Sequence, residues 1–251
     1  MTVPADLAGW RTALRRELIA ARAALAPEVL AAYRHSIDFH IQPALLRTLA
    51  GLARAESRPA VIAFCWPYMN EYDARPLLAG LRGTAGGLVT ALPVVVAPKT
   101  PLIFRHWRPG VAMIAGPLGI PFPRDTPEVR PDAVLLPVVG FDAAGYRLGY
   151  GGGYFDRTLA AMLPSPLDGP APRVVEGTRP LVIGTAYEML SLPTIYPQPH
   201  DQPLDFLVTE RGLYERVGGV LQYRGAPPPG YSSPACLAGE IAPGYFGEEP
   251  A

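Results

Sequence analysis

Residues 135–157 read LLPVVGFDAAGYRLGYGGGYFDR, and this stretch decides how the chain folds and what it binds. The segment opens as an apolar run suited to a buried strand, passes through a glycine-rich loop and ends in residues that favour a helix. Its glycines are Gly140, Gly145, Gly149, Gly151, Gly152 and Gly153. Glycine allows positive φ and close approach of a ligand, and a helix start presents unpaired N–H donors. The segment therefore predicts an anion-binding loop between a strand and a helix.

The charged residues that flank this loop suit a bound phosphate group. Arg147 and Arg157 can reach phosphate oxygens, and Asp156 in the first helical turn can hold a divalent metal. Two better-known phosphate loops do not fit, because no lysine follows the glycines and Tyr154 stands where a dinucleotide fingerprint needs its third glycine. The alternative is a surface turn without a ligand, in which Asp156 only complements the helix dipole.

Residues 145–157, GYRLGYGGGYFDR, resemble the signature G-x-R-[LI]-G-x-G-x-G-[YF]-[YF]-D of the 5-formyltetrahydrofolate cyclo-ligase family, also called methenyltetrahydrofolate synthetase. Further matches lie in the basic first helix and in residues 70–73, 91–93, 102–104, 199–201 and 205–210. The resemblance covers roughly residues 8–217 and leaves out the tail.

The resemblance implies an enzyme that converts 5-formyltetrahydrofolate to 5,10-methenyltetrahydrofolate while ATP becomes ADP and phosphate. The formyl oxygen is a poor leaving group, so the family phosphorylates it and a neighbouring nitrogen then closes the ring. Such a reaction requires cations and N–H donors around the phosphoryl group, and a metal that bridges its oxygens. ATP, Mg²⁺ and a reduced folate are therefore the expected co-substrate, metal and substrate.

The family's functional positions map onto residues of this chain. The resemblance implies ATP contacts at Arg11, Arg15, Arg147, Leu148, Gly149, Tyr150, Gly151, Gly152, Gly153, Tyr154 and Phe155. It implies substrate contacts at Trp66, Glu71, Tyr150, Gly151, Gly152, Gly153 and Tyr154. Arg147 and Tyr154 are the expected catalytic residues, and Asp156 and Asp201 the expected Mg²⁺ ligands.

Several of these assignments have structural alternatives. Arg11 and Arg15 lie four residues apart, hence on one helix face, which could simply be solvated. The family usually has lysine at position 11, and arginine presents a planar fork instead of an ammonium group. Asp201 could form a loop Asx turn. Among the aromatic residues, Trp66 and Tyr154 are expected to face a ligand.

Two departures from the family pattern bear on the substrate. Phe122 follows Gly119-Ile-Pro where the family often has an acidic residue, and Leu190 stands where many members have glutamine. Both are expected near the substrate side, where they would remove polar groups. Two alternatives to the folate enzyme therefore stay open: a paralogue that activates another amide-like or heterocyclic substrate, and a non-catalytic nucleotide- or folate-binding protein.

Composition excludes several kinds of partner. The chain has 251 residues, and its 22 basic and 22 acidic residues cancel, so no broad electrostatic field points to nucleic acid or an anionic membrane. The two cysteines show no metal-ligand spacing, and neither a signal peptide nor a membrane-spanning run is visible. We expect a cytoplasmic protein without nucleic-acid or membrane partners. The sequence does not define the oligomeric state, and a monomer is compatible with it.

The hydrophobic pattern predicts an α/β fold. Helices are expected at 6–25 and from Pro27 to about Leu52, where Pro43 should break or kink the second helix, and shorter helices near 74–81 and 154–162. Strands are expected at 60–66, 88–96, 102–107, 133–139, 181–187 and 205–209. Near-continuous apolar strands indicate a three-layer fold with a mainly parallel, Rossmann-like central sheet flanked by helices.

This organisation also predicts where the domain ends and where a ligand binds. Residues 1–223 form the predicted cyclo-ligase-like domain, residues 164–180 a surface loop, and residues 224–251 a Pro/Gly-rich irregular tail. Ligands of open α/β sheets bind beyond the carboxyl ends of the strands. The glycine loop and the segment around Glu71 should therefore share one crevice. Phe104 and Trp107 are expected to pack in the core.

Overall fold

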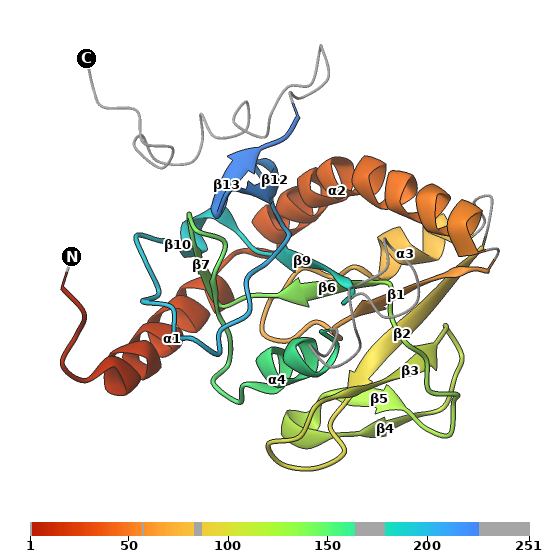
Figure 1. Ribbon diagram of the computed structural model, residues 1–251, viewed down its shortest axis with the longest axis horizontal. Coiled ribbons are helices and arrows are strands. Elements are labelled where there is room, and N and C mark those ends of the chain that lie inside the picture. The colour runs from red at the N-terminus through yellow and green to blue at the C-terminus, as the bar shows by residue number, and fades with distance from the viewer. Residues whose placement is uncertain (1, 57, 83–86, 164–178, 226–251) are drawn as a thin grey trace, which may run out of the picture.

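The computed structural model describes residues 2–56, 58–82, 87–163 and 179–225. Its sheet of eight strands has the order β13-β12-β11-β9-β6-β1-β2-β3 (Figure 1). The strands are β1 Ala60–Phe64, β2 Leu88–Val94, β3 Ile103–Trp107, β6 Ala133–Pro137, β9 Leu181–Thr185, β11 Phe206–Thr209, β12 Gly212–Val217 and β13 Val220–Tyr223. The inner strands β11, β9, β6, β1 and β2 are mutually parallel, β3 and β12 run antiparallel to them, and β13 pairs antiparallel with β12. The predicted mainly parallel sheet is confirmed.

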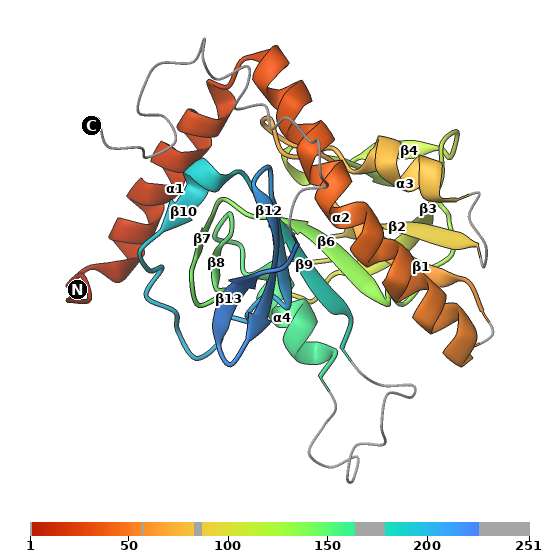
Figure 2. The same cartoon turned by 90° about the horizontal axis from the view of Figure 1, so that it is seen from above.

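Helices cover both faces of this sheet. The helices are α1 Leu7–Ala23, α2 Pro27–Glu56, α3 Arg75–Leu81 and α4 Tyr154–Ala161. In two views at right angles, α2 and α3 cross one face, α4 lies on the other, and α1 runs past the end that carries β7 and β10 (Figures 1 and 2). The three-layer α/β prediction is therefore confirmed. No helix among the described residues combines the length and the hydropathy that a membrane span requires.

Small elements complete the fold around the carboxyl ends of the parallel strands. They are the strands β4 Met113–Ala115, β5 Pro121–Pro123, β7 Gly140–Asp142, β8 Arg147–Leu148 and β10 Ser191–Leu192, and the 3₁₀ turns η1 Pro117–Gly119 and η3 Glu188–Leu190. Strands β4 and β5 form one hairpin, and β10, β7 and β8 form a second small sheet. The β7–β8 hairpin leads directly into the glycine-rich loop, so the small sheet fixes where that loop begins.

The predicted break of the second helix at Pro43 is wrong, whereas the alternative, a kink, stays a prediction. Helix α2 runs without a break through Pro43. Proline has no N–H for the carbonyl four residues earlier, and this loss normally costs about 3 kcal/mol. Ile37, Ile41 and Leu45 are fully buried along the same stretch, and together they contribute several kcal/mol of apolar burial. Packing against the sheet therefore outweighs the local cost of the proline.

The core is continuous across the sheet and its helices. Central strand β1 is buried at every position, and the side chains of Phe64, Leu78, Leu92 and Leu135 are almost completely enclosed. Phe104 and Trp107 are 2% and 6% exposed, which confirms that they pack in the core. The predicted loop at 164–180 falls mostly outside the described residues, and the predicted tail lies outside them from residue 226 onward.

Candidate active site

A cavity of about 780 Å³ opens at the carboxyl ends of the parallel strands. The glycine loop and the segment around Glu71 both line it, as the sequence predicts. Every residue predicted for the site lines this one cavity: Arg11, Arg15, Trp66, Glu71, Arg147, Leu148, Gly149, Tyr150, Gly151, Gly152, Gly153, Tyr154, Phe155, Asp156 and Asp201. The structure thus brings together segments that lie up to 190 residues apart in sequence.

The glycine loop has the backbone geometry that its sequence predicts. Gly151 has φ of +94°, and Gly153, which forms the N-cap of α4, has φ of +62°. A β-carbon at Gly151 would lie 3.4 Å from the guanidinium carbon of Arg15. Both positions therefore require glycine, the first because of φ and the close cation, the second because of φ. The loop packs directly beneath a positive charge.

Arg147 and Asp156 form an ion pair at the base of the loop. The Nη2 atom of Arg147 lies 2.8 Å from Oδ1 of Asp156, and Arg147 is only 8% exposed. The same carboxylate oxygen accepts a 3.0 Å hydrogen bond from the backbone N–H of Gln202, and Arg147 donates to the Gln202 carbonyl. Burial lowers the pKa of Arg147, and Asp156 acts against this shift. The pair joins β8, α4 and the 199–202 segment.

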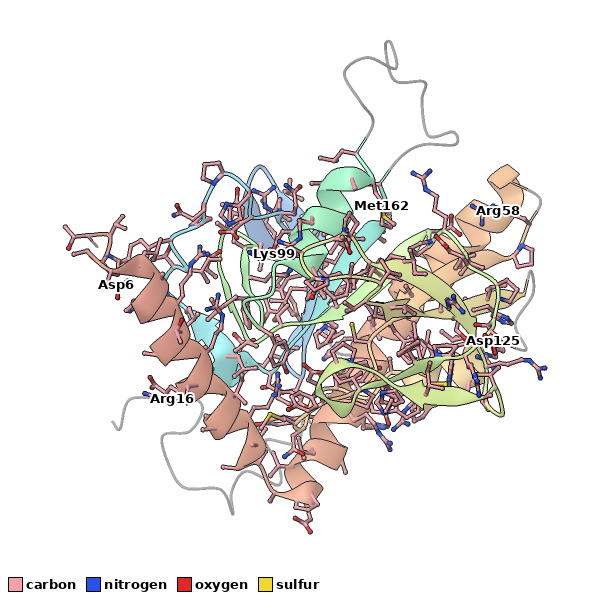
Figure 3. All side chains as sticks on the ribbon, turned by 90° about the horizontal axis from the view of Figure 1, so that it is seen from below. Asp6, Arg16, Arg58, Lys99, Asp125 and Met162 are labelled. Carbon is pink, nitrogen blue, oxygen red and sulfur yellow. The ribbon has the colours of Figure 1, made fainter. Side chains whose placement is uncertain are left out.

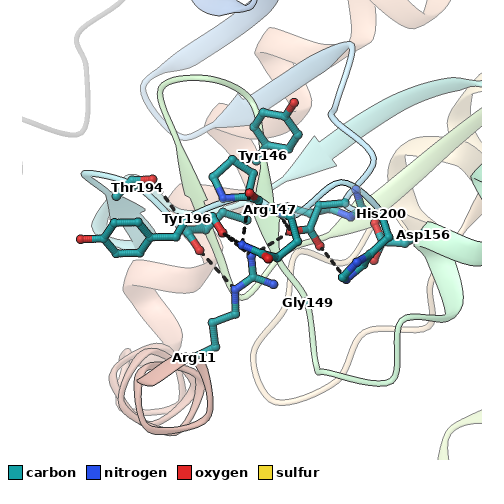
Figure 4. A network of polar contacts seen from close by, with 12 residues as sticks. Arg11, Tyr146, Arg147, Gly149, Asp156, Thr194, Tyr196 and His200 are labelled. Carbon is teal, nitrogen blue, oxygen red and sulfur yellow. Dashed lines mark hydrogen bonds and ion pairs between the residues drawn. The ribbon is translucent and has the colours of Figure 1, made fainter. Parts of the chain in front are cut away.

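Arg11 and Asp201 form a second pair on the other side of the loop (Figure 4). Nη2 of Arg11 lies 2.8 Å from Oδ2 of Asp201 and 2.9 Å from the carbonyl oxygen of Tyr196, while Nε donates to the Ile195 carbonyl at 3.2 Å. Burial alone would raise the pKa of Asp201, but hydrogen bonds from Arg11 and from the Gln198 N–H hold it below its usual value. All three Arg11 contacts use the planar fork that lysine lacks.

Arg15 completes a cluster of three guanidinium groups. Its Nε donates a 2.7 Å hydrogen bond to the carbonyl of Gly149, so α1 holds the glycine loop directly. Burial, and then repulsion from Arg11, lowers the pKa of Arg15. Since Arg11, Arg15 and Arg147 line one cavity with only two acidic partners, the site can accept a further anion.

The structure does not by itself establish the predicted metal site. Among the described residues, no group of three or more His, Cys, Asp or Glu side chains is arranged to hold a metal ion. Asp156 and Asp201 both face the cavity, but each is bound to an arginine. Carboxylate oxygens suit Mg²⁺, which commonly takes one or two carboxylates together with substrate phosphates. The donor atoms fit that ion once a nucleotide supplies the remaining ligands.

Aromatic residues also line the cavity. Trp66 follows β1, and the guanidinium carbon of Arg75 lies 4.2 Å from the centroid of its ring. Arg75 is held in turn by both oxygens of Asp73. Tyr154 begins α4, with the guanidinium carbon of Arg157 5.4 Å from its ring centroid. As expected, both Trp66 and Tyr154 face the cavity, where planar apolar walls suit a planar ring.

Glu71 is part of a buried polar network. Its carboxylate accepts hydrogen bonds from the Tyr150 hydroxyl and, at 3.0 Å, from the backbone N–H of Tyr68. The Nη2 atom of Arg22 lies 3.6 Å from the same carboxylate. Burial raises the pKa of Glu71, and its three partners act against this rise. The predicted substrate contact is therefore tied to the glycine loop through Tyr150.

Arg22 is the functional candidate that the sequence interpretation missed. It is not among the site residues expected from the sequence, yet it is only 2% exposed. Arg16, by contrast, is exposed and projects from the outer side of α1 (Figure 3). The sequence spacing could have indicated this position for Arg22. Arg11, Arg15 and Arg22 follow one another at intervals of four and seven residues, which places them on one helix face. That face is turned toward the body of the protein.

The two departures from the family pattern have different outcomes. Phe122, on β5, lines the cavity as expected. The expected position of Leu190 is wrong, because it is 1% exposed, belongs to the hydrophobic core and is absent from the cavity wall. A long apolar side chain at position 190 fills core volume, so the missing glutamine does not alter the cavity.

The model of the 5-formyltetrahydrofolate cyclo-ligase family matches residues 8–210. The chain belongs to this family. A cyclo-ligase of Escherichia coli K12 is 34% identical over 104 residues, which are 39% of this chain and 56% of that protein. The corresponding protein of Mycolicibacterium smegmatis is 32% identical over 118 residues, 45% of this chain and 55% of its own length. The chain thus spans little more than half the length of these curated relatives.

Solved structures named methenyltetrahydrofolate synthetase share the fold of this cyclo-ligase family member. The Aquifex aeolicus protein has a TM-score of 0.58 and 23% identity, covering 88% of this chain and 98% of that one. The Mycoplasma pneumoniae protein has a TM-score of 0.54 and 22% identity, covering 80% and 98%. At these identities the likeness establishes the architecture, and the site chemistry depends on the residues described above.

Proposed function

We propose that this protein is an ATP-dependent ligase that converts 5-formyltetrahydrofolate to 5,10-methenyltetrahydrofolate and releases ADP and phosphate. One observation carries the proposal: a cationic loop and a buried carboxylate beside aromatic walls line the same cavity. This arrangement supports phosphate binding beside planar-ring binding, as the reaction requires. Family membership supports the same assignment.

The reaction divides into two steps. The formyl oxygen attacks the γ-phosphorus of ATP, the bond to the β-phosphate breaks, and ADP leaves. The neighbouring nitrogen then attacks the formyl carbon and loses its proton, and the carbon–oxygen bond breaks to release phosphate. Arg147, assisted by Arg11 and Arg15, balances the charge on the moving phosphoryl group. The N–H groups of residues 149–153 hold the triphosphate, and Tyr154 places the ring against it.

The substrate side of the cavity selects and orients the ring. Glu71 accepts hydrogen bonds from the donor-rich edge of the pterin, and Trp66 packs against its face. Bound Mg²⁺ would neutralise and align the phosphate oxygens, with Asp156 and Asp201 as its protein ligands. Arg11 and Arg147, which pair with these carboxylates, line the same cavity and would supply positive charge for the phosphates.

Methenyl formation gives the direct test. Purified protein is mixed with ATP, MgCl₂ and 5-formyltetrahydrofolate, and the methenyl chromophore is followed together with ADP release. We expect both products in equal amounts, and no turnover at high enzyme concentration would refute the proposal. Asp125→Asn is a matched control, since the Asp125 side chain is 87% exposed and does not line the cavity.

A paralogue acting on a different amide-like or heterocyclic substrate is the second candidate. Phe122 favours it, because an apolar ring lines the cavity where the family often has an acid. This candidate predicts ATP hydrolysis that depends on another metabolite while 5-formyltetrahydrofolate is ignored. A non-catalytic binding protein would instead retain ligand affinity without ADP release in either assay.

Three further expectations remain predictions. They are the cytoplasmic location, the absence of nucleic-acid and membrane partners, and the division into a domain at 1–223 and a tail at 224–251. A monomer is compatible with the sequence, and sedimentation of the full chain would determine the oligomeric state.

A further inference from the structure

Arg22 is a fully buried arginine at the end of α1 that contacts neither the glycine backbone nor the other site arginines. Its Nε donates to the Met69 carbonyl at 2.9 Å, and Nη1 and Nη2 donate to the Val138 and Tyr68 carbonyls at 3.4 Å each. Nη2 also donates to the Tyr150 hydroxyl at 2.5 Å. A buried arginine is costly unless its donors are satisfied, so this arrangement fixes the guanidinium in one place.

The turn that carries Glu71 is strained and is held against α1. Met69 and Asn70, neither of them glycine, have φ of +48° and +60°. Side chains are unfavourable in this left-handed region, so surrounding contacts must maintain both residues. Arg22 binds the Met69 carbonyl, and the Asn70 side chain donates to the Ala23 carbonyl at 3.1 Å. The last turn of α1 therefore dictates where the Glu71 carboxylate lies.

The Tyr150 hydroxyl has only one possible orientation in this network. Arginine can only donate, and an ionised carboxylate can only accept. The hydroxyl oxygen therefore accepts from Arg22, and its single hydrogen goes to Glu71. Tyr150 as a whole is 41% exposed, so its hydroxyl contacts, more than burial of its ring, hold the residue in place.

We propose that Arg22 is a positioning residue for the reduced-folate substrate, acting by holding the Glu71 carboxylate directly and through the Tyr150 hydroxyl. The inference rests on the proposed function, in which Glu71 contacts the pterin edge. The role of Arg22 can be tested separately from nucleotide binding, because Arg22 lies further along α1 than the arginines expected to contact ATP. Arg15 and Arg11 precede Arg22 by seven and eleven residues, about 10 and 16 Å along the helix axis. Removing the Arg22 fork should therefore weaken folate binding and spare ATP binding.

Steady-state kinetics with both substrates varied provides the test. Arg22→Lys keeps the positive charge but lacks the planar guanidinium group. Tyr150→Phe removes only the hydroxyl, and the double variant carries both substitutions. Each single variant is expected to raise the KM for 5-formyltetrahydrofolate about tenfold, with the KM for ATP within about twofold of wild type. The double variant should resemble the worse single variant, because the two residues act on one carboxylate. Arg16→Lys, on the exposed side of α1, is the matched control.

The outcomes separate the inference from the proposed function. A wild-type protein without methenyl formation refutes the proposed function and the inference with it. If wild type is active, both KM values rising together, a loss confined to kcat, or additive effects in the double variant would each overturn the role of Arg22. If Arg22→Lys fails to fold, Tyr150→Phe decides alone, since it leaves every Arg22 bond to the backbone in place.

Discussion

Arg147 and Asp156, nine residues apart in sequence, meet at 2.8 Å across the glycine loop. Their contact closes the loop at its base. Arg147 is buried, so water solvates its charge poorly and the Asp156 carboxylate is its counter-charge. The pair therefore maintains the loop before a nucleotide arrives. Under the proposed function, Asp156 would also hold Mg²⁺, and Arg147 would supply positive charge for the phosphates.

Asp156→Asn separates these two roles. We expect the free energy of unfolding to fall by about 1–3 kcal/mol, because a buried guanidinium loses its counter-charge. We also expect turnover to fall at least about a hundredfold while ATP affinity drops only moderately. Urea unfolding, calorimetry with an ATP analogue and the methenyl assay measure the three quantities. An active variant would exclude Asp156 from metal binding.

Gly151→Ala tests the backbone geometry of the loop, with Gly149→Ala for comparison. Gly151 has φ of +94°, whereas an alanine β-carbon at Gly149 would meet no atom within 4 Å. A side chain forced to positive φ costs about 1–2 kcal/mol, so the loop should relax and nucleotide affinity should fall about tenfold. Gly149→Ala should retain the thermal stability of wild type. Equal affinities for the two variants would contradict the argument.

Acidification tests the Arg11–Asp201 pair. The pKa of Asp201 lies below its usual value of 3.8, so the unfolded chain binds the proton more readily than the folded one. The stabilising contribution is therefore complete above about pH 4 and is lost as the pH falls through the folded pKa. Melting temperatures should decline more steeply below about pH 4 in wild type than in Arg11→Gln. Arg224→Gln, which removes an exposed pair with Glu215, should leave the wild-type slope unchanged.

Pro43→Ala tests whether packing outweighs local preference in α2. The substitution restores an N–H inside the helix at an exposed position, so we expect stability to rise by about 1–3 kcal/mol. Pro27→Ala is the matched control, because Pro27 occupies the first turn, where the missing N–H would have no helical partner. Chemical denaturation of both variants measures the difference. A destabilised Pro43→Ala protein would show that the proline ring itself contributes to packing.

Much of the fold and the site followed from short-range patterns. The five inner strands, strand β3, all four helices and the shared crevice could be predicted, because each depends on apolar runs and on glycines that are visible in sequence. The β12–β13 hairpin was missed, although Gly218 and Gly219 between two β-forming runs signal a tight turn. Both glycines have positive φ, as such a turn requires.

The remaining features depend on which groups meet in space. Leu190 carries no local sign that it points into the core, and nothing near Arg22 in the sequence reveals Tyr150 and Glu71 as its partners. Those contacts are 128 and 49 residues distant in sequence. The pairing of Asp201 with Arg11 was also invisible, because it depends on the turn that brings residues 195–202 under α1. The pairing of Asp156 with Arg147 spans only nine residues, but it depends on how the glycine loop closes.

Helix α1 makes completion of the site a late event during protein synthesis. Arg11 emerges from the ribosome early, yet its carboxylate partner Asp201 is added 190 residues afterwards. Arg15 likewise awaits the Gly149 carbonyl, 134 residues further along. Closing such long loops is entropically costly until the central sheet has formed. A nascent chain should therefore acquire this arrangement of α1 around the glycine loop only after residues 195–202 have been translated.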